Sequence, residues 1–136
     1  MLYIKPIMDK NLQRCLCEKA GIEYNDDFMA YFAAESDDCG ETIKRYLGIL
    51  QFSIEKDPKL ESVAQMPGVD DEEAMIIMGR AVMSFLFRDC GFDIFRCGCD
   101  LNTDLLKKIG FRADNGEMTI DLAHFFDAPC RYDKGM

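Results

Sequence analysis

The chain has 136 residues, of which 49% are hydrophobic and 30% are charged. This composition is typical of a soluble globular protein, and a chain of this length buries roughly 70% of its unfolded surface, so we expect residues 1–136 to form a single domain. The net charge of −9 argues against nucleic acid and anionic membrane as partners, because clustered lysine and arginine supply most of the affinity for both.

Neither a targeting segment nor a membrane span is evident in the sequence. The first ten residues, MLYIKPIMDK, become polar too quickly for a signal peptide. The most apolar window, residues 74–87, contains Arg80 and is too short to cross a bilayer. The seven cysteines are odd in number, so we expect them to be reduced thiols in a cytoplasmic protein.

Two cysteine pairs raise the question of a zinc site. One residue separates Cys15 from Cys17, and one residue separates Cys97 from Cys99. Structural zinc sites usually space their cysteines by two to four residues and often add histidines. His124 is the one histidine of the chain. We therefore expect no metal site.

In the first half of the chain, the spacing of apolar residues predicts four strands and one helix. Residues 2–7 form a short strand, and Asp9 caps a helix that continues to Ala20 and ends at Gly21. The apolar run 28–36 predicts a buried strand. Residues 46–56 alternate apolar and polar side chains, which is the period of a strand. After a turn, residues 60–66 form the fourth strand.

The second half begins with a helix from Asp71 to Cys90, whose apolar residues cover most of its circumference. A strand over 92–97 and a short helix over 101–110 follow. Residues 114–117, DNGE, predict a hairpin turn. The last strand, residues 118–126, places a partly buried His124 on one face with Ile120 and Leu122. The order β-α-β-β-β-α-β-α-β-β predicts an α/β (α+β) fold with a mixed sheet and helices on both faces.

Two segments carry a resemblance to a known family. Residues 105–111, LLKKIGF, resemble the end of the helix pattern Asn-x-x-Ala-x-x-Leu-Tyr-x-x-x-Gly-Phe, and residues 78–87, MGRAVMSFLF, resemble the start of a central helix. Both patterns are typical of the GNAT superfamily of N-acetyltransferases, and the likeness covers nearly the whole chain. It implies a mostly antiparallel, twisted sheet in which strands 60–66 and 92–97 run parallel and splay apart near Met66.

The resemblance also implies a reaction and a cofactor. GNAT enzymes move an acyl group from acetyl-CoA to an amine, so the cofactor here would be acetyl-CoA and the acceptor an amine of a small molecule or a protein. The likeness places the cofactor-binding residues at Gln65, Met66, Gly79, Arg80 and Asn102. It is also compatible with a homodimer.

The segment between Pro67 and Gly79 departs from the family pattern. The family's loop, Arg/Gln-x-x-Gly-x-Gly/Ala, lays backbone N–H groups around the CoA pyrophosphate. Here the segment reads GVDDEEAMIIM, without a glycine pair or a basic residue. Acids in a first turn stabilise a helix by roughly 0.3–1 kcal/mol each, but at about 5 Å each repels a diphosphate by roughly 3 kcal/mol. The sequence favours a capped structural helix over a phosphate cradle.

The catalytic positions are also altered. The pattern's tyrosine, commonly the general acid for the leaving thiolate, falls on Leu106, which cannot donate a proton. The loop that carries the acidic run Asp70–Glu73 is called the acidic loop below. Glu61, on the strand before it, is the nearest candidate general base, and Glu35 and Glu55 are alternatives. Cys99, at the end of the expected strand 92–97, is a second catalytic candidate, as a reactive thiol.

Two functions remain open on the sequence. The first is a GNAT-type N-acyltransferase that moves an acyl group from acyl-CoA to an amine. The second is a binding or regulatory module that keeps the fold without binding CoA. The fold favours the first function, whereas the acidic loop and Leu106 favour the second. The fold alone does not decide between them, because function resides in sites and not in folds.

Overall fold

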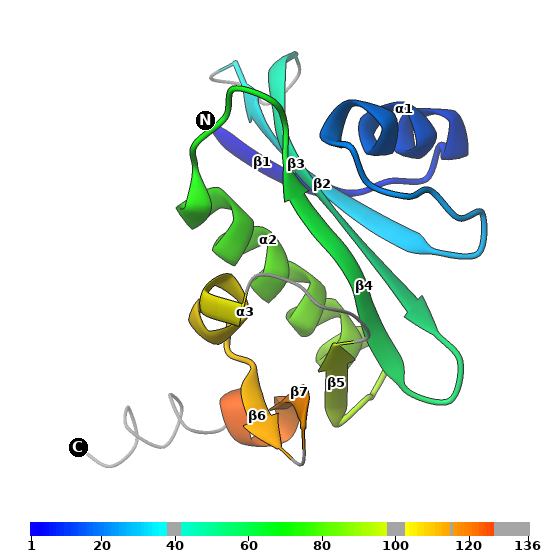
Figure 1. The fold of residues 1–136 in the computed structure, drawn as a ribbon, viewed down its shortest axis with the longest axis vertical. Coiled ribbons are helices and arrows are strands. Elements are labelled where there is room, and N and C mark those ends of the chain that lie inside the picture. The colour runs from blue at the N-terminus through cyan, green and yellow to red at the C-terminus, as the bar shows by residue number, and fades with distance from the viewer. Residues whose placement is uncertain (38–41, 98–102, 115, 127–136) are drawn as a thin grey trace.

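The computed structural model describes residues 1–37, 42–97, 103–114 and 116–126, and its elements follow the predicted order (Figure 1). The strands are β1 (Leu2–Pro6), β2 (Met29–Ser36), β3 (Ile43–Ile54), β4 (Pro58–Gln65), β5 (Ile94–Cys97), β6 (Arg112–Asp114) and β7 (Glu117–Asp121). The helices are α1 (Lys10–Ala20), α2 (Glu72–Ser84) with a π-helical turn (Phe85–Asp89), and α3 (Thr103–Ile109).

The strands form one sheet in the order β1-β2-β3-β4-β5-β7-β6. Strands β4 and β5 run parallel, and every other described pair is antiparallel. The predicted parallel pair and the mostly antiparallel mixed sheet are therefore confirmed. The hairpin predicted at 114–117 is confirmed by the pairing of Asp114 with Glu117.

Helices cover both faces of this sheet, as predicted (Figure 1). On one face, α1 buries Leu16 and Cys17 in a cluster with Phe32 and Ile49. On the other face, α2 and α3 bury a larger cluster, which includes Leu47, Leu50, Phe52, Met75, Met78, Val82, Leu106 and Phe111. Among the described residues, no helix is long and apolar enough to cross a bilayer.

The ends of the two long helices follow local rules that the sequence displays. The Asp9 carboxylate accepts the N–H of Asn11, and Gly21 ends α1 in the left-handed conformation at φ 74°. The Asp71 carboxylate accepts the N–H of Ala74 at the start of α2. The predicted single helix 71–90 is only partly correct, because its last turn widens into the π-helical segment Phe85–Asp89.

The prediction of a last strand through residue 126 is wrong. Strand β7 ends at Asp121, and residues 122–126 are helical. The physical reason is a helix cap: the Asp121 carboxylate accepts the N–H of His124 at 3.0 Å. His124 is consequently exposed and does not share a buried face with Ile120.

The cysteine side chains give a testable prediction. Of the described cysteines, Cys15 and Cys90 are exposed, Cys97 is half-buried, and Cys17 is buried. Burial raises the pKa of Cys17 to about 11. Because the thiolate is the reactive form, we expect Cys15 and Cys90 to react with a thiol reagent at pH 8 well before Cys17.

The measurement is a time course of thiol labelling in native protein, read by peptide mass spectrometry. Labelling of unfolded, unreduced protein is the control, and should reach all seven cysteines. A count of five or fewer in that control would contradict the expectation of reduced thiols. Rapid native labelling of Cys17 would contradict its buried environment.

Candidate active site

The centre of the sheet is incompletely covered along β4. In β3, every residue from Leu47 to Phe52 is buried, whereas every β4 residue from Glu61 to Gln65 is only half-buried. The described pairing with β5 joins Lys59 to Arg96 and Leu60 to Cys97. Beyond Leu60 no described strand pairs with this edge of β4. Residues 98–102, which follow β5, lie outside the described residues, so the splay expected near Met66 stays a prediction.

A β-bulge lies where this open edge begins. Phe52 of β3 pairs with Leu60, while its neighbour Gln51 pairs with Ser62, so Glu61 is the extra residue. Consecutive residues of a regular strand point to opposite faces. Here Glu61 and Ser62 line the same cavity, because a bulge redirects side chains locally. Bulges of this kind are frequent beside active sites.

The cavity lies between β4 and the loop that follows α1. It has a volume of about 410 Å³ and is lined by Ile22, Glu23, Asn25, Phe28, Glu61 and Ser62. We call it the β4 cavity. Its volume falls in the range of roughly 300–1,000 Å³ that small-molecule sites usually have.

A buried hydrogen-bond network fixes the walls of the β4 cavity. Gln13 of α1 and Gln51 of β3 are both fully buried. The Gln13 amide nitrogen donates to the Gln51 side-chain oxygen at 2.9 Å. The Gln51 amide nitrogen in turn donates to Ser62 Oγ at 3.0 Å and to the carbonyl of Glu23 at 2.8 Å. Satisfied buried networks of this kind hold a local structure in one arrangement.

The same network holds the far end of the loop. The carbonyl of Phe28 accepts hydrogen bonds from Gln13 Nε2 at 3.2 Å and from Lys10 Nζ at 2.6 Å. The loop is therefore attached to α1 and β3 at both Glu23 and Phe28. The cavity is preorganised by side chains outside its lining.

Glu61 is positioned by a neighbouring strand. The Ser53 hydroxyl of β3 donates to Glu61 Oε2 at 2.6 Å. The two alternative bases lie elsewhere: Glu35 forms an ion pair with Arg45, which lowers the pKa of its carboxyl, and Glu55 is exposed at the end of β3. Among the three, Glu61 alone lines the β4 cavity.

Three backbone donors of the acidic loop are engaged within the chain. The N–H of Asp71 donates to Gln65 Oε1 at 2.6 Å, and the N–H of Ala74 donates to the Asp71 carboxylate at 3.1 Å. The N–H of Val69 donates to the carbonyl of Met66 at 3.1 Å. The Gln65 side chain thus holds the loop against the end of β4, and these three N–H groups already donate to acceptors within the chain.

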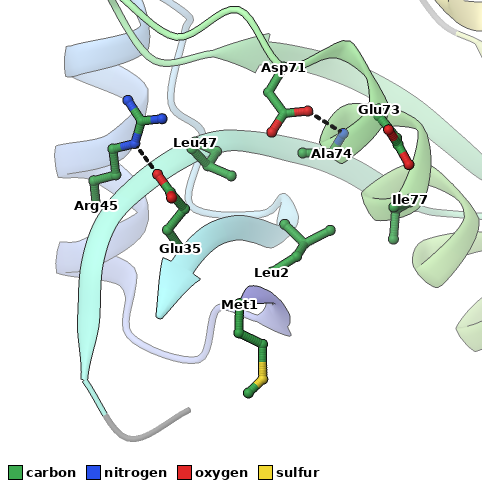
Figure 2. A pocket seen from close by; sticks show the side chains of 9 residues that line it. All are labelled: Met1, Leu2, Glu35, Arg45, Leu47, Asp71, Glu73, Ala74 and Ile77. Atoms are coloured by element: carbon green, nitrogen blue, oxygen red, sulfur yellow. Dashed lines mark hydrogen bonds and ion pairs between the residues drawn. The ribbon is translucent and has the colours of Figure 1, made fainter. Parts of the chain in front are cut away.

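The surroundings of the start of α2 are also acidic (Figure 2). A small pocket of about 280 Å³ is lined there by Met1, Leu2, Glu35, Arg45, Leu47, Asp71, Glu73, Ala74 and Ile77. Its one guanidinium is paired with Glu35 (Figure 2). At the outer side of the first turn, Lys108 of α3 is paired with Glu72. This charge distribution does not fit a diphosphate.

The other residues expected to bind the cofactor have structural contacts. Arg80 donates to the carbonyls of Lys108 and Ile109 at the end of α3. A Cβ on Gly79 would lie 2.9 Å from Cδ1 of Ile109, so this glycine permits the close contact of α2 with α3. Met66 is almost completely buried. Their roles in cofactor binding stay predictions.

Three predictions concern the region after β5. Leu106 is buried in the core, so no side-chain acid stands at the position of the family's tyrosine. Cys97 is half-buried at the end of β5. Cys99 and Asn102 lie outside the described residues. In the part of the chain that the structure describes, no group of three metal-ligating side chains is found.

Sequence reasoning missed the residues that shape the cavity, namely Glu23, Phe28, Gln13, Gln51 and Ser62. A signal existed for two of them. Gln13 precedes Cys17 by one helical turn on the buried face of α1, and Gln51 lies in the middle of the apolar stretch of β3. Buried glutamines need hydrogen-bond partners, so each could have been expected to find a polar group across the α1–sheet interface.

No family model and no curated protein sequence matches this chain, but solved structures do. The matching structures include a mutant form of the spermidine/spermine N-acetyltransferase SpeG from Vibrio cholerae, with a TM-score of 0.67 and 9% identity over 94% of this chain and 99% of that one. The IAA acetyltransferase from Bacillus cereus matches with a TM-score of 0.66 and 13% identity over 89% and 99%. This chain has the GNAT fold.

A further structure with the GNAT fold that matches is a dodecameric spermidine N-acetyltransferase from Vibrio cholerae, with a TM-score of 0.67 and 9% identity over 93% of this chain and 97% of that one. At such identities the likeness concerns the fold. The chemistry of this chain has to be argued from the β4 cavity and the open edge of β4.

Proposed function

We propose that this protein is an N-acyltransferase that transfers an acyl group from an acyl-CoA to an amine bound in the β4 cavity. The observation that carries the proposal is the β-bulge at Glu61. It directs the Glu61 carboxylate into the β4 cavity, beside the open edge of the parallel β4–β5 pair. The GNAT fold of acetyltransferases supports the same reaction class.

Each part of the site has a role in this reaction. A bound acyl-CoA supplies a thioester carbonyl that an uncharged amine can attack. Glu61 takes a proton from the acceptor ammonium, directly or through one water, which frees the nitrogen lone pair. Ser53 holds the carboxylate in place through its hydrogen bond. The N–C bond forms as the C–S bond breaks, the electron pair of the C–S bond leaves on sulfur, and the second proton of the attacking nitrogen passes to water.

The leaving thiolate receives no proton from the position of the family's tyrosine, because that position is Leu106. A free thiol has a pKa of roughly 8.5, so a thiolate is an acceptable leaving group near neutral pH and can take its proton from water. We expect the reaction to tolerate this substitution at some cost in rate.

The open edge of β4 is the part of the site that suits the donor. Its residues from Glu61 to Gln65 are half-buried, so we expect an extended pantetheine to lie along them, while the acidic loop gives little to the diphosphate. We infer that the donor is held mainly through its pantetheine and acyl group. We then expect this protein to bind acyl-CoA more weakly than a protein whose loop offers free N–H donors and basic residues to the diphosphate.

The variant Glu72→Gln tests this account of the donor. It removes one negative charge from the first turn of α2 and releases Lys108 for a phosphate. We expect acetyl-CoA to bind roughly tenfold more tightly at low ionic strength, and the gain to shrink as salt is added. Calorimetric titration at two salt concentrations measures this.

The matched control is Glu55→Gln, which removes an exposed charge at the opposite end of β4 from the acidic loop. It should leave the affinity unchanged. Equal affinities of wild type and Glu72→Gln at both salt concentrations would contradict a donor site beside the start of α2.

The reaction itself is tested by incubating the protein with acetyl-CoA and a panel of amines. Amine-dependent release of free thiol, with the N-acetylated amine identified by mass spectrometry, is the expected result. If acetyl-CoA neither shifts the melting temperature nor is consumed, the module without CoA binding becomes the better account. A ligand present at 100 times its Kd should stabilise the fold by roughly 2.7 kcal/mol, which melting curves detect readily.

A further inference from the structure

We propose that the acceptor is a small primary amine on an apolar stem that carries no carboxylate, as in the arylalkylamines. This inference rests on the proposed function, since it concerns the amine that the β4 cavity holds. It comes from the charges, the walls and the rigidity of that cavity.

The ionisable groups of the cavity have one sign. Among the described residues, the ionisable ones that line it are Glu23 and Glu61, both acidic, and no described lysine or arginine lines it. Glu61 lies on the strand, and Glu23 is exposed at the rim. A ligand ammonium is therefore attracted at either end of the cavity, whereas a ligand carboxylate meets two like charges.

Two basic side chains of α1, the helix that precedes the loop, already have partners. Lys10 Nζ donates to the carbonyl of Phe28 and to the Gln13 side chain. Arg14 lies over the ring of Tyr24 at 5.0 Å and 4.0 Å from the Asp26 carboxylate. A ligand carboxylate could recruit either cation only by breaking these contacts. Discrimination against amino acids is thus built into the surroundings as well as the lining.

Besides the two acids, the lining has two apolar side chains, Ile22 and Phe28, and two uncharged polar ones, Asn25 and Ser62. Ile22 and Phe28 are both half-buried, so part of each side chain is available to a ligand. An aromatic or branched stem can pack there, with its ammonium at Glu61 and its far end toward the rim. The Ser62 hydroxyl, which accepts from Gln51, keeps its own hydrogen for donation.

The cavity is also built to keep this shape. Gln51 and Gln13 hold the backbone of the loop at Glu23 and at Phe28, and both glutamines are fully buried. A rigid cavity of about 410 Å³ suits a small molecule that is mostly enclosed. The side chain of a lysine within a folded protein would fill little of it.

The test compares two ligands that differ only by a carboxylate: phenethylamine and phenylalanine. Binding to the protein without donor is measured by NMR titration, and acetyl transfer is measured in parallel with acetyl-CoA. We expect phenethylamine to bind at least tenfold more tightly than phenylalanine and to be the better acceptor by a similar factor. Glu23→Gln should lower the ratio of the affinity for phenethylamine to that for phenylalanine, because it removes one of the two charges that repel the carboxylate of phenylalanine.

Glu18→Gln is the matched control, since Glu18 is an exposed acid of α1 outside the cavity. It should leave the ratio unchanged. Equal binding of the two ligands, or a preference for phenylalanine, overturns the proposed acceptor class. The expected binding preference without any acetyl transfer would instead contradict the acyltransferase function and leave the assignment of the cavity standing.

Discussion

Glu61→Gln should lower kcat/KM for acyl transfer by roughly 10² to 10⁴, the range that general-base catalysis supplies. Glutamine keeps the size of the side chain and can still accept the hydrogen bond from Ser53. It cannot take a proton from an ammonium at neutral pH. The variant therefore removes the proton transfer and preserves the geometry of the β4 cavity.

The pH profile separates this role from a structural one. A larger fraction of the acceptor amine is already deprotonated at high pH, so the deficit of Glu61→Gln should diminish as the pH rises toward the pKa of the amine. Ser53→Ala should cause a smaller loss, because it only loosens the carboxylate. Unchanged kcat/KM in Glu61→Gln, with a melting temperature equal to that of wild type, would contradict the assignment of the base.

The order of the elements could be predicted from the sequence because each one is specified locally. Asp9 and Gly21 delimit α1, and both act in the structure as the sequence suggested. The parallel pairing of β4 with β5 was implied by the resemblance to the GNAT superfamily, and the strand–helix–strand order with α2 as the connection agrees with it. These features depend on neighbours in the sequence, so one chain is enough to read them.

The features that the sequence did not reveal depend on contacts between distant segments. The bulge at Glu61 arises from a register shift between β3 and β4. The alternation of apolar and polar residues along either strand does not predict such a shift. The partnership of Gln13 with Gln51 joins residues 38 positions apart. The helical turn at 122–126 replaced a strand because Asp121 acts as a cap. An apolar run cannot by itself distinguish a strand from a short packed helix.

The stability of the site should depend most strongly on Gln51. Replacing it by leucine takes one of its two acceptors from the Gln13 amide nitrogen, which keeps the carbonyl of Phe28, and takes the Gln51 donor from the Ser62 hydroxyl and from the carbonyl of Glu23. A buried polar group left unpaired costs roughly 1–3 kcal/mol. Because the loop can let water reach the carbonyl, we expect a total loss of about 2–4 kcal/mol in the free energy of unfolding.

The measurement is denaturant unfolding, with the double variant Gln13→Leu/Gln51→Leu as the informative comparison. Removing both amides leaves fewer orphaned groups than removing one, so the double variant should lose less stability than the sum of the two single variants. The coupling should be about 1 kcal/mol or more, as for contacting residues of one network. Asn11→Leu, on the exposed side of α1, is the control and should change stability by less than about 0.5 kcal/mol.

The same variants connect stability to function. Gln51→Leu leaves Glu61 and the apolar lining of the β4 cavity in the chain, but the loop loses its anchor at Glu23. We expect its binding of phenethylamine to weaken even at temperatures where the protein stays folded, because the ligand must then order the loop that it binds. Strictly additive losses in the double variant, with ligand binding intact in all three, would mean that the two glutamines do not act as a unit. The cavity would then owe its shape to the apolar packing of α1 alone.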